Sequence, residues 1–115
     1  MVAASAIAEK PRRLEKIFIS DEGKLSPNGI YAVNFYTLGV PHTVIFDDYL
    51  PMVPDNNGGW RTLFAHIGDD NSLWTLILEK AFAKYHGNYK NIALGMPQNA
   101  FRALNGSPCS KWYHN

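Results

Sequence analysis

Residues 69–87 read DDNSLWTLILEKAFAKYHG, and this stretch predicts the helix around which the rest of the chain is arranged. Its apolar residues recur at the i, i+3, i+4 and i+7 spacing that marks one buried helix face. They are Trp74, Ile77, Leu78, Ala81, Phe82 and Tyr85. Asn71 is expected to cap the helix behind two aspartates that favour the positive end of its dipole, and Gly87 is expected to end it. The charged residues expected on the exposed side are Glu79, Lys80 and Lys84.

Upstream of this helix the sequence changes to the pattern of a β-hairpin. Residues 30–37 and 42–46 are rich in Ile, Val, Tyr and Phe, and residues 38–41 (LGVP) join them. The first strand alternates between more and less apolar residues, so one of its faces is expected to be buried. The residues of that face are Tyr31, Val33 and Phe35.

The remaining segments are short and give an α+β fold class. Residues 1–7 (MVAASAI) carry no capping residue before them and resemble the inside of a helix that Pro11 ends or restarts. The other expected elements are a helical stretch over 12–18, loops over 20–28 and 52–60, a short strand over 62–66 and a last helix over 98–104.

Composition and charge exclude several classes of function. The chain has 115 residues, 46% hydrophobic and 13% aromatic, which suits one small globular unit. Its formal net charge is +1 with no run of like charges, so neither a nucleic-acid surface nor a charged membrane surface is expected. One cysteine, Cys109, rules out an internal disulfide, and no apolar stretch is long enough to span a membrane. We therefore expect a cytoplasmic protein.

No group of residues in the chain predicts a catalytic or metal site. Cys109 has His114 nearby, but both lie in a polar C-terminal stretch, whereas nucleophilic thiols are typically found at helix N-termini. The four histidines lack metal-ligand spacing. Asp47-Asp48 and Asp69-Asp70 fit a turn and a helix start better than ligand pairs, and Gly58-Gly59 is not followed by the Lys of a phosphate-binding loop.

Several segments together resemble the calpain family of cysteine proteases. Residues 71–84 (NSLWTLILEKAFAK) are similar to the calpain pattern in which a Trp precedes Leu-Leu-Glu-Lys-Ala-Tyr-Ala-Lys, and the pattern continues to Gly87 and Tyr89. Residues 29–36 and 44–51 resemble the family hairpin that ends in Asp-Asp, a variable residue, Leu and Pro. The smaller matches are residues 100–106 and Trp112-Tyr113. The resemblance runs in order over nearly the whole chain.

The resemblance implies that residues 1–115 are a partial calpain-type catalytic domain with a papain-like core. In the family a Cys begins a long helix in the first subdomain, and residues 2–9 resemble the end of that helix. The nucleophile is then expected about three residues before Met1, at a helix N-terminus that lowers the pKa of a thiol. The family His and Asn are expected beyond Asn115. No catalytic residue is therefore assigned within the chain, which is expected to be inactive by itself.

The resemblance also bears on substrate and calcium. Gly95 matches the family glycine whose backbone pairs with extended substrate on the unprimed side, although a turn glycine between two helices is an equal alternative; Leu94 replaces the first glycine of a common Gly-Gly pair. Ser72 stands where conventional calpains have a calcium-ligating Glu, so no metal or other cofactor is assigned.

The sequence leaves two functions open. The resemblance favours a segment of an intracellular cysteine endopeptidase that acts on protein substrates together with the rest of its catalytic domain. The alternative is a non-catalytic calpain-like binding or regulatory module.

Overall fold

The computed structural model of the chain describes residues 2–19 and 24–113. In chain order its elements are α1 (Val2–Ala8), α2 (Pro11–Ile17), β1 (Ile30–Thr37), β2 (Val40–Asp47), β3 (Met52–Pro54), β4 (Trp60–Thr62), α3 (Trp74–Tyr85), the 3-10 helix η2 (Tyr89–Ile92) and α4 (Pro97–Asn105). The strands form two separate antiparallel pairs, β1 with β2 and β3 with β4. This is the predicted α+β class. The expected loop over 20–28 lies partly outside the described residues, and His114 lies outside them entirely.

The β1–β2 hairpin forms as the alternation predicted, with a tighter turn. Thr37 pairs directly with Val40, so the second strand begins two residues earlier than expected. Leu38 and Gly39 make the turn, and both have positive φ, 50° and 79°. A two-residue hairpin loop whose twist matches that of its strands requires this conformation. The buried side chains of β1 are Tyr31, Val33 and Phe35.

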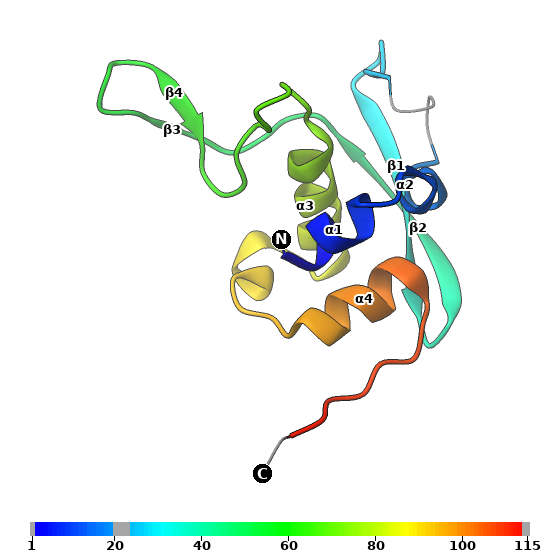
Figure 1. Cartoon of the computed structure of the whole chain (residues 1–115). Coiled ribbons are helices and arrows are strands. Elements are labelled where there is room, and N and C mark those ends of the chain that lie inside the picture. Colours follow the sequence, from blue (N-terminus) through cyan, green and yellow to red (C-terminus); the bar gives the residue numbers. More distant parts are fainter. Residues whose placement is uncertain (1, 20–23, 114–115) are drawn as a thin grey trace.

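Helix α3 packs across the buried face of this hairpin and forms the centre of the molecule (Figure 1). The Phe35 side chain is fully buried, and its ring lies 5.6 Å from that of Phe82 and 5.2 Å from that of Tyr85, measured between centroids. Leu76 and Ala83 are buried as well, although they lie outside the predicted face. The helix is therefore covered on more of its surface than its amphipathic pattern indicates, and Leu76 lies beside Thr62 of β4 and Tyr89 of η2.

The predicted exposed side of α3 is partly wrong. The Lys80 ammonium donates to the Asp47 carboxylate and to the carbonyl of Tyr49, and only 16% of the Lys80 side chain is exposed. The Lys84 ammonium donates to the Ile45 carbonyl at 2.6 Å. These lysines tie α3 to β2 and to the turn that follows it. Helix periodicity does not reveal such long-range partners.

The predicted start of α3 is also wrong. The helix begins at Trp74, and Asn71 has a φ of 60°, outside the helical region. Residues 68–72 instead form a turn in which the Gly68 amide donates to the Ser72 carbonyl at 3.2 Å. The Asp70 carboxylate accepts from the Ser72 amide at 3.0 Å, so this side chain stabilises the turn and not the helix end. The predicted stop is confirmed, because Gly87 follows α3 with a φ of 99°.

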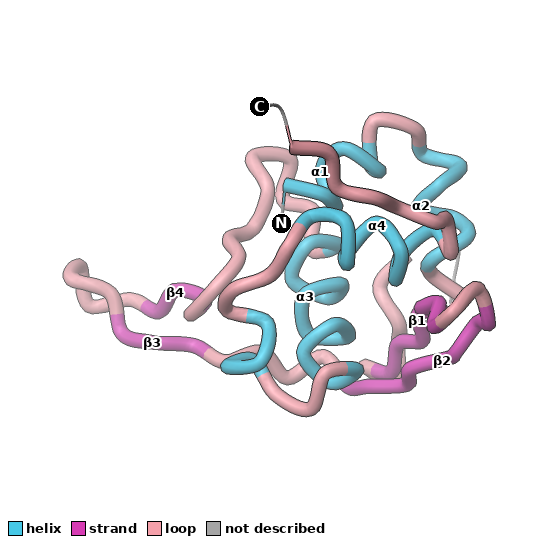
Figure 2. Tube along the Cα trace, turned by 90° about the horizontal axis from the view of Figure 1, so that it is seen from below, coloured by secondary structure: helices cyan, strands magenta, loops and turns pink. Residues whose placement is uncertain are grey.

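The β3–β4 hairpin projects from the body as an arm (Figures 1 and 2). It occupies the expected loop over 52–60, and the strand expected over 62–66 ends at Thr62, so both expectations were wrong. The Asp55 carboxylate organises the turn by accepting from the amides of Asn57 and Gly59, each at 2.8 Å. This local hydrogen bonding lets a Gly- and Asn-rich stretch form a hairpin.

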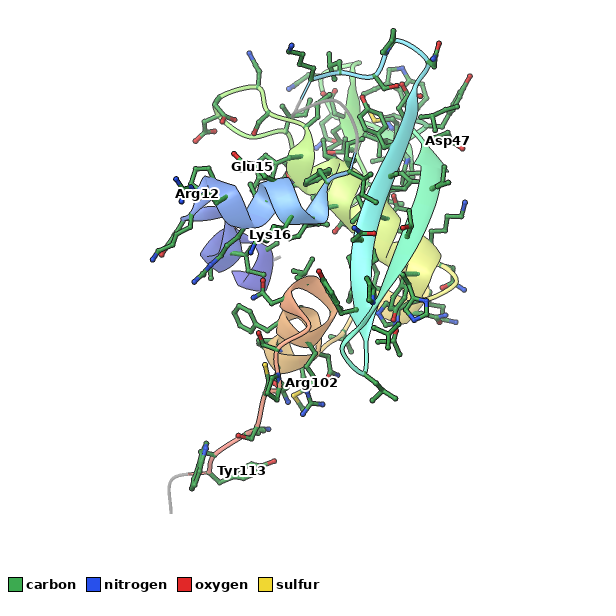
Figure 3. All side chains as sticks on the ribbon, turned by 90° about the vertical axis from the view of Figure 1, so that its right-hand side faces the viewer. Arg12, Glu15, Lys16, Asp47, Arg102 and Tyr113 are labelled. Atoms are coloured by element: carbon green, nitrogen blue, oxygen red, sulfur yellow. The ribbon has the colours of Figure 1, made fainter. Side chains whose placement is uncertain are left out.

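The N-terminal helices and α4 complete the body. Pro11 restarts a helix as the first residue of α2, whose charged residues Arg12, Glu15 and Lys16 lie on its exposed surface (Figure 3). The chain leaving α2 bridges β1 through Phe18 and Val33. Helix α1 packs on α4, and α4 packs on β1. The final segment, 106–113, extends away from the body and carries Tyr113 outward (Figures 1 and 3).

Candidate functional site

The substrate-side candidate, Gly95, lies on an exposed loop between η2 and α4. The loop begins after Ile92 and ends where Pro97 opens α4. The Leu94 side chain is 93% exposed. The φ of Gly95 is not in the left-handed region, and no heavy atom lies within 4 Å of where a Cβ would stand. Neither the local backbone conformation nor the surrounding packing therefore requires glycine here.

A groove of about 410 Å³ runs beside this loop, between α1, α3 and α4. Its lining is mostly apolar and includes Phe82 of α3, Ile92 of η2, Ala100 and Leu104 of α4, and Gly95 itself. The polar residues of this lining are Glu79, His86, Asn91 and Asn99. A mostly apolar groove with few polar groups suits a peptide or an apolar side chain.

Helix η2, which leads into the Gly95 loop, is held at its start and from the side. The Asn88 side chain accepts from the Asn91 amide at 3.0 Å, and the Asn91 side chain donates to the His86 carbonyl at 2.7 Å. The ring of Tyr89 stacks on that of Phe64, which follows the β3–β4 arm; the centroids are 4.7 Å apart and the planes differ by 7°.

Glu79 joins the same region to α3. Its carboxylate accepts from the amide of Ala65, the residue after Phe64, at 2.9 Å. Burial raises the pKa of the Tyr89 phenol, and the negative charge of Glu79 raises it further, so the phenol stays neutral well above neutral pH. Sequence reasoning assigned Glu79 to an exposed face and gave Phe64 no role. The available signal was an acidic residue directly after the apolar run of residues 76–78.

The lone thiol is not paired with an imidazole among the described residues. Cys109 is free and half-buried, and its Sγ donates to the Ser107 carbonyl at 3.6 Å. The Arg102 guanidinium donates to the backbone carbonyl of Cys109. This segment opens no helix, whereas nucleophilic thiols are typically found at helix N-termini.

The described histidines and acidic pairs do not converge on one site. The His86 ring packs edge-on against Phe82 at 4.4 Å between centroids, and His66 Nδ1 lies 3.5 Å from the Thr62 hydroxyl. Asp47 pairs with Lys80, and this hydrogen bond holds the Asp47 pKa below its usual value. Within residues 2–19 and 24–113, no three His, Cys, Asp or Glu side chains come close enough together to hold a metal ion.

The residues around Ser72 do not fit a calcium site by themselves. The hydrogen bonds from the Ser72 hydroxyl and amide lower the Asp70 pKa, so this carboxylate already has partners in its own turn. Calcium takes roughly six to eight oxygen ligands, and one carboxylate with one hydroxyl is far from that number.

Comparison with known proteins identifies the family. The model of the calpain family cysteine proteases matches residues 1–115. The calpain-type cysteine protease DEK1 of Zea mays is 34% identical over 105 residues, which are 91% of this chain and 5% of that protein. Calpain-A of Drosophila melanogaster is 35% identical over 85 residues, 74% of this chain and 10% of that protein. A calpain of Schistosoma mansoni is 27% identical over 111 residues, 95% of this chain and 14% of that protein.

The chain belongs to the calpain family of cysteine proteases. It spans 5% to 14% of the length of the relatives named above, so most of each relative lies outside the matched segment. The observed helices and small antiparallel sheets agree with a calpain protease core subdomain. Among the described residues, no helix has the length and apolar character needed to cross a membrane.

Proposed function

We propose that this chain forms most of the first catalytic subdomain of a calpain-type cysteine endopeptidase, after the nucleophile, and that Gly95 pairs its backbone with extended protein substrates. The observation that carries the proposal is the open surface at Gly95. A turn glycine is usually explained by a positive φ or by a close neighbour, and Gly95 has neither. A remaining reason for glycine at this position is that an extended peptide approaches the backbone closely.

Within the described residues the chain holds a substrate surface without a reaction centre. A thiol nucleophile requires an imidazole within hydrogen-bond reach, and the Cys109 thiol donates to a carbonyl instead. We propose that the nucleophile is supplied by the residues that precede Met1 and the base by those that follow Asn115. The single free thiol fits a cytoplasmic location, where thiols stay reduced.

The proposal is tested first by the coding sequence. In-frame sequence upstream of Met1 is expected to encode a Gly-Asp-Cys-Trp-like stretch, and downstream sequence is expected to encode the His and Asn. A complete locus without these segments would refute the endopeptidase and favour a non-catalytic calpain-like module.

A second test concerns Gly95 in the longer protein. Gly95→Val adds side-chain bulk at an open surface position, so it is expected to leave folding intact while raising KM for an extended peptide about tenfold. Leu94→Ala, next to it, is the control and is expected to change KM by less than about twofold. An unchanged KM for Gly95→Val would remove Gly95 from the substrate site.

A further inference from the structure

Two contacts and a short helix connect the base of the β3–β4 arm to the Gly95 loop. The Glu79 carboxylate holds the Ala65 amide at 2.9 Å and thereby fixes the backbone beside Phe64. The Phe64 ring then stacks on Tyr89 with nearly parallel planes, 7° apart. Tyr89 is the first residue of η2, and the Gly95 loop starts where this short helix ends. All of these residues come from the chain segment between the arm and α4.

The loop has little packing of its own, so its position depends on what holds its two ends. Leu94 is 93% exposed, Met96 is 50% exposed, and no heavy atom contacts the open side of Gly95. At one end α4 is anchored by its packing on β1 and α1. At the other end is η2, a helix of 4 residues, too short to be stable without outside contacts.

The stack with Phe64 ties η2 to a segment 25 positions earlier in the chain. It therefore restrains the position of the helix relative to the β3–β4 arm, which the local hydrogen bonds of η2 do not. The bonds between Asn88 and Asn91 and between Asn91 and His86 connect η2 only to itself and to the end of α3. Phe64 is 41% exposed, so what restrains η2 is the parallel stacking of the two rings and not deep burial.

We infer that Phe64 and Glu79 are positioning residues, which hold Tyr89 and, through η2, place the Gly95 loop where it meets substrate. The inference rests on the proposed function for its consequence in catalysis, but the physical coupling can be measured without it. The β3–β4 arm thereby becomes part of the substrate site through the residues at its base.

The first measurement is hydrogen exchange, in the 115-residue chain, of the two hydrogen-bonded amides that lead into the loop, those of Asn91 and Ala93. Phe64→Leu keeps an apolar side chain and removes the stacked ring. It is expected to speed exchange of the Asn91 and Ala93 amides about three- to tenfold. Tyr89→Phe keeps the ring and removes a hydroxyl that makes no hydrogen bond among the described residues, so exchange is expected to stay within about twofold. Trp60→Leu, a similar change at an exposed position on the same arm, is the second control and is expected to have no effect.

A conservative pair of substitutions tests Glu79. Glu79→Ala removes the acceptor for Ala65 while favouring the helix, and it is expected to speed exchange of the same amides. Glu79→Gln retains an acceptor oxygen and is expected to restore slow exchange. Tyr89→Leu removes the stack from the other side and repeats the test if Phe64→Leu does not fold.

The second measurement separates this inference from the proposed function. In the longer protein, Phe64→Leu is expected to raise KM for an extended peptide about threefold or more with kcat unchanged, as loss of uniform binding does. If folded Phe64→Leu and Tyr89→Leu leave the exchange of the Asn91 and Ala93 amides as in the wild type, the positioning role is refuted, whatever Gly95→Val does. If the exchange changes but Gly95→Val leaves KM unchanged, the coupling stands and the substrate role of Gly95 fails.

Discussion

Replacing Leu38 with Asn at the tip of the β1–β2 hairpin is expected to stabilise the protein. Leu38 has a φ of 50° and its side chain is 99% exposed, so it adopts an unfavourable backbone conformation without burying apolar surface in return. Asn tolerates this left-handed conformation far better, and Asn-Gly is the preferred pair for a two-residue hairpin turn. Gly39, which follows, already supplies the second half of that pair.

The size of the gain follows from the backbone alone. A residue with a normal side chain loses about 1–2 kcal/mol in the left-handed region, and Asn recovers part of this loss. Since no heavy-atom packing is removed, Leu38→Asn is expected to raise the free energy of unfolding by about 0.5–1 kcal/mol, or the melting temperature by roughly 2–4 °C. Leu94→Asn is the matched control, because Leu94 is 93% exposed but has no positive φ.

The assay is urea unfolding of the 115-residue chain, followed by circular dichroism with wild type and both variants side by side. The midpoint is expected to rise for Leu38→Asn with an unchanged m-value, and to stay within error for Leu94→Asn. Equal midpoints for Leu38→Asn and wild type would refute the strain argument. An equal gain in Leu94→Asn would show that loss of exposed apolar surface, and not φ, is responsible.

Three further predictions concern the core, a helix end and pH. Phe35→Ala, at a side chain with no exposed surface, is expected to lower the free energy of unfolding by about 3–5 kcal/mol, and a loss below 1 kcal/mol would contradict the packing of Phe35 on α3. Gly106→Ala is expected to lower the free energy of unfolding by about 2–3 kcal/mol, because the φ of Gly106 is 67° and the new Cβ would meet the Tyr36 ring at 3.0 Å. Gly39→Ala is the control, since Gly39 has a φ of 79° but open space around it, and it is expected to lower the free energy of unfolding by about 1 kcal/mol. Equal losses for the two variants would rule out the ring contact. The hydrogen bond from Lys80 lowers the Asp47 pKa, so its stabilisation is present above the ordinary pKa of 3.8 and is lost as pH falls below it. Asp47→Asn is therefore expected to make stability less dependent on pH in this acid range, and an unchanged acid profile measured by thermal unfolding would contradict the pairing.

The sequence predictions were correct where local periodicity decides the structure and wrong on contacts that join distant positions in the chain. The alternation of Tyr31, Val33 and Phe35 and the i, i+3, i+4 pattern around Ile77 predicted a hairpin and a helix correctly, because local periodicity records which face is buried. The start of α3 was misplaced because the Asp70 side chain bonds within a preceding turn. Capping residues and turn residues are the same residue types, so the sequence pattern does not separate them.

The candidate site was less predictable than the fold. Gly95 was found through resemblance to the calpain family, and no periodicity singled it out. Gly95 has open surroundings, which no sequence pattern indicates. The Phe64–Tyr89 stack and the Glu79–Ala65 hydrogen bond each join positions far apart in the chain. Such contacts depend on how the β3–β4 arm and η2 lie against α3, and that arrangement leaves no mark in local sequence patterns.

The amino-acid sequence by itself therefore determined the fold class, the main helix and hairpin, and the calpain family, since these depend on local periodicity and on the order of motifs along the chain. Only the tertiary structure decided that Lys80 is bound to Asp47 and not solvated, that residues 52–62 form a projecting arm, and that Gly95 faces open space. The physical reason is that these features depend on side chains that meet across the fold. Their free energies are set by distance and burial in space and not by spacing in the sequence.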